Sequence, residues 1–171
     1  GSFIIYDGGY RDTTDTEILA ELWGTLNDLT PDGNKIIIRA WIITHPHNDH
    51  YGTFINFCNT YAKNVTLETM IVNQITEEVR SMQANDGYLQ NYLAADVAKF
   101  EGAVICNVYP GMVFDFGSLR MEILGTHHDA FILSTPKGTS NNTCVVSRLI
   151  TENDQMLLLA DAGVDQMESM S

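Results

Sequence analysis

The segment IIIRAWIIT at residues 36–44 limits how this chain can fold more than any other feature. It is strongly β-prone and mostly apolar, and a strand of this kind is normally covered on both faces. Such cover requires helices or a second sheet packed against each side of the strand. The 171 residues are enough to supply these layers and a substantial core within one domain.

Apolar periodicity predicts alternating strands and helices in the first part of the chain. Strands are expected within residues 2–10, 36–44 and 65–73, and helices over 15–28, from Asp49–Gly52 onward and over 88–100. Residues 103–129 read as short strands, residues 142–161 as a hairpin with a polar turn, and a last helix is expected near Val164. This order predicts layers of helices against mixed sheet. Asp96 falls beside the apolar stripe of the 88–100 helix, so we expect its charge to reach water.

The charge balance limits the classes of partner. The formal net charge is −13, and the nine basic residues are scattered without a cluster. Nucleic-acid binding without sequence preference depends on Lys and Arg that neutralise phosphates, so no extended nucleic-acid surface is expected. A small metal-lined pocket that takes a phosphate group stays compatible with this balance. The sequence shows no membrane segment and no signal peptide, and it leaves the compartment and the oligomeric state open.

The cysteines predict neither a disulfide framework nor a cysteine zinc site. Cys58, Cys106 and Cys144 are far apart, odd in number and without a C-x-x-C pair, so we expect buried free thiols. Residues 1–171 are expected to form a single domain that is incomplete at both ends. This expectation rests on the Gly-Ser start, on the strand-like run that follows it at once, and on a C-terminus soon after Asp161.

A dense group of metal-ligating residues directly follows the apolar run, in the sequence THPHNDH. Three of the five histidines lie between residues 45 and 50. Imidazoles and carboxylates are good ligands for Zn²⁺ and for ions such as Mn²⁺ or Fe²⁺. Alternate residues of an extended segment point to one side, so His45 and His47 can meet one ion. Asp49 and His50, in the first turn of the following helix, can meet a second ion, and Asp49 is also a candidate proton shuttle. Surface or capping histidines without a metal are disfavoured by this concentration.

Further candidates lie elsewhere in the chain. His127 and His128 follow a β-like run, and either they complete a metal shell or contact substrate, or they form a solvated loop pair. Asp129 beside them has the same alternatives. Asp161 ends the apolar run MLLLAD, which is apolar enough for a central strand, and is expected either to bridge two ions or to cap the next helix. Asp7 occupies a similar strand end and is expected to be a turn or supporting residue more often than a ligand.

These segments together resemble the metallo-β-lactamase superfamily. The H-x-H-x-D-H signature matches at residues 45–50, IIYDGG resembles that family's early strand, and MLLLADAG resembles its late strand with the bridging aspartate, with Ala160 in place of a glycine. The resemblance runs from about Phe3 to Asp161. HPHNDHYG and SNNTCVVSRLI look most like the hydrolase domain of ComEC-type bacterial competence proteins and their soluble relatives, with Cys144 where serine is usual.

The resemblance implies an α/β fold of four αββα layers and a metal-dependent hydrolase. Its cofactors would be two divalent ions, with zinc favoured, and its nucleophile a metal-bridging hydroxide. The ions would lie between His45 and His47 on one side and Asp49 and His50 on the other, with Asp161 as the bridge. The implied catalytic residues are Asp49 and His50, and the implied substrate is a phosphodiester or another small ester.

The sequence departs from the family pattern at two points. Asn141 or Asn142 stands where many members have a further histidine, for which His127 or His128 could substitute. No histidine follows Asp161, where the family has its last one. Two alternatives to the phosphodiesterase therefore stay open, namely a catalytically degenerate metal- or ligand-binding module of the same fold and a thioester or lactam hydrolase.

Overall fold

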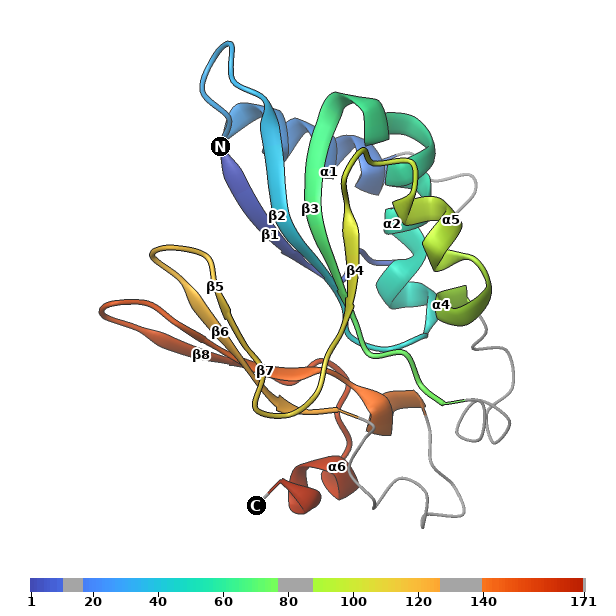
Figure 1. The fold of residues 1–171 in the computed structure, drawn as a ribbon, viewed down its shortest axis with the longest axis vertical. Coiled ribbons are helices and arrows are strands. Elements are labelled where there is room, and N and C mark those ends of the chain that lie inside the picture. Colours follow the sequence, from blue (N-terminus) through green and yellow to red (C-terminus); the bar gives the residue numbers. More distant parts are fainter. Residues whose placement is uncertain (11–16, 77–87, 127–139, 171) are drawn as a thin grey trace.

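The computed structural model describes residues 1–10, 17–76, 88–126 and 140–170, and these form two four-stranded sheets with helices outside them (Figure 1). The first sheet is parallel throughout and has the spatial order β1 (Ser2–Tyr6), β2 (Ile36–Ile43), β3 (Val65–Val72) and β4 (Val104–Asn107). The second sheet is antiparallel throughout and has the order β5 (Val113–Asp115), β6 (Arg120–Gly125), β7 (Val146–Ile150) and β8 (Gln155–Leu158).

The helices form the two outer layers, so the expected four-layer αββα fold is confirmed. One face of the first sheet is covered by α1 (Glu17–Asp28), α2 (Asn48–Tyr61), α4 (Tyr88–Asn91) and α5 (Leu93–Val97). The short helix α6 (Val164–Ser169) packs on the second sheet, where Met170 at its C-terminal end lies directly over Gly125. Two 3-10 turns, η1 (Ala62–Asn64) and η3 (Ser140–Thr143), complete the described elements. None of the helices in the described ranges is long and apolar enough to cross a membrane.

The strand β2 is buried on both faces, as its apolar sequence predicts. Trp41 and Ile43 pack into the core beneath the helices, whereas Ala40 and Ile42 pack into the core between the sheets. All four side chains are completely buried. Because both faces of β2 are buried, its sequence does not alternate between apolar and polar residues.

Two expectations about the helices and sheets were wrong. The sheets are not mixed, because each contains one type of pairing in the described residues. The predicted 88–100 helix is two short helices, since the backbone of Tyr92 leaves the helical region with φ −128°.

The expectation that the charge of Asp96 reaches water was also wrong. Asp96 is only 9% exposed, accepts a hydrogen bond of 2.6 Å from the Tyr88 hydroxyl and pairs with Lys99.

The cysteines are free thiols, as expected. Cys58 and Cys144 are buried, but Cys106 is only half-buried, because it lies on β4 at the edge of the first sheet. The first two residues of the predicted 15–28 helix, Asp15 and Thr16, lie outside the described residues.

Candidate metal centre

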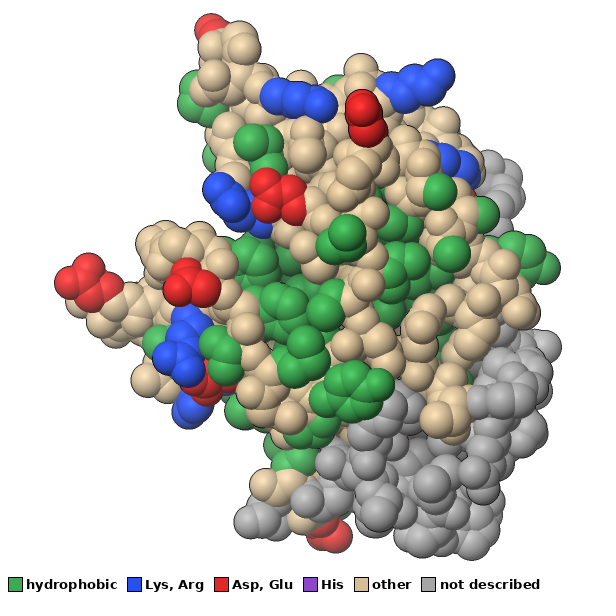
Figure 2. Space-filling model, viewed as in Figure 1, with side chains coloured by type: hydrophobic (Ala, Val, Ile, Leu, Met, Phe, Trp, Pro, Cys, Tyr) green, Lys and Arg blue, Asp and Glu red, His purple; other side chains and the backbone are tan. Residues whose placement is uncertain are grey.

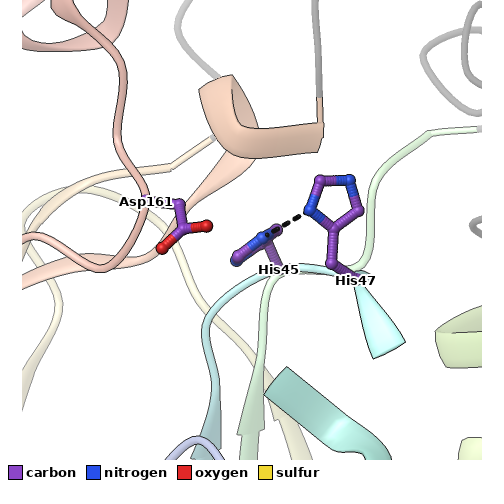
Figure 3. Close-up of side chains that lie close together, drawn as sticks. All are labelled: His45, His47 and Asp161. Carbon is purple, nitrogen blue, oxygen red and sulfur yellow. Dashed lines mark hydrogen bonds between the residues drawn. The ribbon is translucent and has the colours of Figure 1, made fainter. Parts of the chain in front are cut away.

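The histidine cluster lies at the junction between β2 and α2, at the carboxyl end of the parallel sheet. His47 precedes the first residue of α2 and still has an extended backbone, with φ −78° and ψ 144°. His45 and His47 therefore point to the same side, and the Nε2 atom of His45 lies 3.0 Å from the Nδ1 atom of His47. Figure 3 shows the two rings directed at one another. Two imidazole nitrogens thus lie close together, as expected for alternate residues of an extended segment.

Asp161 reaches this pair from the other sheet (Figure 3). One ligand atom each from His45, His47 and Asp161 lie within 4.8 Å of one another. The expectation of a central strand ending in Asp161 was wrong. The strand β8 ends at Leu158, lies at the edge of the second sheet, and leaves Asp161 in the loop before α6. The carboxylate is brought to the histidines by the packing of the two sheets.

Asp49 and His50 are in the first turn of α2, as predicted. The Nε2 atom of His50 lies 3.5 Å from Asp161 Oδ2 and 3.9 Å from Asp49 Oδ2. The side chain of His50 is 14% exposed, whereas that of Asp49 is 58% exposed. His50 and Asp161 are thus in contact, and Asp49 lies at the open side of the centre.

Asp7 lies behind the histidines and contacts two parts of the cluster. Its Oδ2 atom is 2.9 Å from His50 Nδ1 and 2.9 Å from the Thr44 hydroxyl, and its Oδ1 atom accepts the Thr44 N–H at 2.9 Å. The Thr44 hydroxyl in turn lies 3.0 Å from His45 Nδ1. Asp7 is therefore a supporting residue in this structure, placed beside Thr44 because β1 and β2 are parallel neighbours.

The surroundings of His45 and His50 shift the pKa values of these two rings in opposite directions. Burial, together with the neighbouring His50 and His47, lowers the pKa of His45 to about 3, so its ring is neutral and able to bind a metal. Burial also lowers the pKa of His50, but the hydrogen bond and charge of Asp7, with the charges of Asp161 and Asp49, outweigh it. The pKa of His50 is therefore raised. A positive charge is thus stabilised at the point where the carboxylates meet.

The comparison with protein families decides the class of this site. The model of the metallo-beta-lactamase superfamily matches residues 1–167. The chain belongs to the metallo-beta-lactamase superfamily. No curated protein matches it significantly.

The donor set fits the divalent ions that this superfamily generally binds. Two imidazoles and a carboxylate within 4.8 Å can hold an ion of the zinc, manganese or iron type. His45 suits this role because its low pKa keeps a nitrogen lone pair free at neutral pH. The candidates His127, His128 and Asp129 lie outside the described residues.

Sequence reasoning did not single out Thr44 and did not place Cys144 at the centre. The Cys144 sulfur lies 3.4 Å from His45 Nδ1, and burial raises the pKa of its thiol to about 12, so it is a neutral thiol here. Thr44 carries a signal that was available, because it is the polar residue directly before the first ligand and at the end of a strand. For Cys144 no such signal exists, since its contact with His45 depends on how the second sheet packs.

Proposed function

We propose that this protein is a metal-dependent hydrolase that acts on a phosphodiester or a related small ester. The observation that carries the proposal is the convergence of His45, His47 and Asp161 at the carboxyl end of the parallel sheet, in a chain of the metallo-beta-lactamase superfamily. When bound, two divalent ions would supply an activated water as nucleophile and stabilise the charge that develops on the substrate oxygen.

Each residue of the cluster has a proposed role. His45 and His47 would hold one ion, Asp49 and His50 would hold the other, and Asp161 would be shared between them. The contact of 3.5 Å between Asp161 and His50 supports the bridging role, since the same carboxylate also belongs to the group with His45 and His47. Asp49 is the proposed proton shuttle because its exposed carboxylate can exchange protons with solvent. His127 or His128 is a proposed additional ligand.

The proposed substrate class rests on the likeness to ComEC-type hydrolase domains in the segments HPHNDHYG and SNNTCVVSRLI. The net charge of −13 supports a small substrate over a long nucleic acid, because a long polyanion needs an extended basic surface. Zinc is the favoured metal, with manganese and iron as alternatives.

The test compares three substrates on one preparation. The protein is stripped with a chelator, reloaded separately with Zn²⁺, Mn²⁺ and Fe²⁺, and assayed with bis(p-nitrophenyl) phosphate, a cephalosporin and a glutathione thioester. Turnover of the phosphodiester is expected. Asp161→Asn should remove most of it, whereas Asp154→Asn, in the exposed turn between β7 and β8, should not. Absence of phosphodiester turnover with every ion would contradict the proposed substrate class, and turnover of only the thioester or lactam would replace it.

A second candidate function is a metal-binding module without catalysis. Asn141 or Asn142, both in η3, stands where many superfamily members have a histidine, and the side-chain oxygen of Asn141 is buried without a hydrogen-bond partner among the described residues. Metal analysis of the purified protein separates the two functions. Two tightly bound ions per chain support the hydrolase, whereas one weakly bound ion or none supports the module.

A further inference from the structure

We propose that Asp7 is a positioning residue that sets the tautomers of both His45 and His50, acting directly on His50 and through the Thr44 hydroxyl on His45. The inference rests on the proposed function, because the tautomer matters when the Nε2 atom of each ring is to bind an ion. The proposal adds a single residue, Asp7, that positions one histidine at each of the two proposed ions.

The direction of each hydrogen bond follows from the number of protons available. An ionised carboxylate only accepts, so the Thr44 hydroxyl donates its single proton to Asp7 Oδ2 at 2.9 Å. The hydroxyl oxygen can then only accept from the ring nitrogen that lies 3.0 Å away, which is His45 Nδ1. His45 therefore carries its proton on Nδ1. The Cys144 sulfur is farther from this nitrogen, at 3.4 Å, and is a weaker acceptor.

The same reasoning applies to His50. Its Nδ1 atom lies 2.9 Å from Asp7 Oδ2, so this nitrogen also donates to the carboxylate. Both rings thereby direct Nε2 toward the candidate centre, where His45 Nε2 meets His47 and His50 Nε2 meets Asp161. The Asp7 Oδ2 atom thus fixes the tautomer of one histidine ligand of each proposed ion. Groups that fix the ring orientation and tautomer of a metal-binding histidine change metal affinity by about 10–100-fold when they are removed.

The backbone holds Asp7 firmly in this place. Its N–H donates to Ile42 O at 2.8 Å, and its carbonyl accepts the Trp41 indole N–H at 3.1 Å. Its φ of 59° lies in the left-handed region, which asparagine adopts as readily as aspartate. An Asp7→Asn variant can therefore keep the same backbone and change only the hydrogen bonding.

This substitution should reverse both tautomers. The amide oxygen must stay at the Oδ1 position to accept the Thr44 N–H, which puts the NH₂ group at the Oδ2 position. The NH₂ group donates to the Thr44 hydroxyl and to His50 Nδ1. The hydroxyl then donates to His45 Nδ1, so both neutral rings carry their proton on Nε2, where the ion should bind. An aspartate-to-asparagine change beside a catalytic histidine of serine proteases has the same effect on the tautomer.

Thr44 provides a matched pair of variants. Thr44→Val removes the hydroxyl at nearly constant shape, and Thr44→Ser keeps it. We expect Thr44→Val to weaken the ion at His45 by about 10–100-fold and to leave the ion at His50 unchanged. Asp7→Asn should weaken both ions by a similar factor, whereas Thr44→Ser and the exposed control Asp154→Asn should weaken neither.

Two measurements test the proposal. Competition of Zn²⁺ between the protein and a chelator gives the two affinities, and ¹⁵N NMR, recorded at a pH at which the histidine rings are neutral, gives the tautomers. The His45 signal of metal-free wild type should show the Nδ1–H form, and that of Asp7→Asn the Nε2–H form. Equal losses of affinity in Thr44→Val and Thr44→Ser would overturn the relay, because packing alone would then explain them. An Nε2–H ring at His45 in wild type would also overturn it.

The NMR experiment keeps this proposal separate from the proposed function. If wild type binds no ion or hydrolyses no substrate, the hydrolase is refuted, yet the ring signals of the metal-free protein still decide whether Asp7 sets the tautomers. If Asp7→Asn does not fold, the Thr44 pair still tests the hydroxyl relay to His45, and the wild-type signals of His50 test the direct contact.

Discussion

The two sheets differ in how completely they are covered, and the difference extends to the candidate metal centre. In the first sheet, Trp41 is fully buried between the helices and the neighbouring strands. In the second sheet, Met156 and Leu157 of the edge strand β8 are 60% and 51% exposed. The first sheet positions His45, which is also fully buried, whereas the side chain of Asp161, beyond the second sheet, is 43% exposed.

The difference suggests a division of tasks at the centre. The parallel sheet provides a rigid base that fixes the histidines, because both of its faces are packed. The antiparallel sheet provides one carboxylate from an exposed loop. Figure 2 shows apolar side chains gathered between the two sheets, and this layer is what joins the two parts. Met121 from the second sheet is a completely buried member of this layer.

The largest stability effect is expected for Trp41→Ala in the first sheet. Trp41 packs edge-on against Phe54 and Phe57 of α2, so its removal leaves a large cavity below the helix that carries His50. The free energy of unfolding should fall by about 3–5 kcal/mol, measured by urea denaturation. A loss below about 1 kcal/mol would show that the first sheet is not the rigid base inferred here.

Met121→Ala tests the layer between the sheets. Met121 is completely buried. Truncation of a buried methionine to alanine lowers the free energy of unfolding by about 2–5 kcal/mol. Because this layer also brings Asp161 to the histidines, we expect weaker Zn²⁺ binding in the same variant. Unchanged metal affinity with reduced stability would separate the site from the inter-sheet packing.

The buried histidine predicts a pH effect in the metal-free protein. The folded state keeps His45 neutral down to about pH 3, while the unfolded chain takes up a proton near pH 6.5. The free energy of unfolding should therefore fall as the pH drops from 6.5 toward 3, by up to about 1.4 kcal/mol per pH unit from this group.

The raised pKa of His50 adds stability as the pH falls toward 6.5 and contributes a constant amount below that value. The contribution of His45 is isolated by comparison with a variant. Urea denaturation of wild type and His45→Asn with a chelator present should give a shallower loss of stability toward acid in the variant. Identical pH dependence in the two proteins would show that the burial of His45 has no such cost.

The smallest effect is expected for Met156→Ala on β8. This is the same substitution as at Met121, in the same sheet, but at a side chain that is 60% exposed. Exposed substitutions change stability by about 0.5 kcal/mol or less. Met156 pairs with Leu149, which pairs with Met121, so it lies on the same face as Met121 but at the sheet edge. A loss comparable to that of Met121→Ala would indicate that this edge is covered in solution, and sedimentation analysis would then show whether a second copy covers it.

Much of the fold was predictable because local patterns carry it. The apolar run at residues 36–44 predicted a strand with two buried faces, and the helical spacing from Phe54 to Tyr61 predicted α2. The split at Tyr92 and the burial of Asp96 were not predictable from the apolar spacing. The carboxylate of Asp96 is buried where it accepts a hydrogen bond from the Tyr88 hydroxyl and pairs with Lys99, contacts that form only in the folded state.

For the site, the sequence alone determined that His45, His47, Asp49 and His50 lie together. These four residues fall within six consecutive positions, so the chain itself keeps them close. The tertiary structure decided which partners meet them. Asp161 is more than a hundred residues away, and Asp7 reaches Thr44 and His50 only through the parallel pairing of β1 with β2. Contacts between such distant segments arise from the packing and register of sheets, which no local pattern specifies.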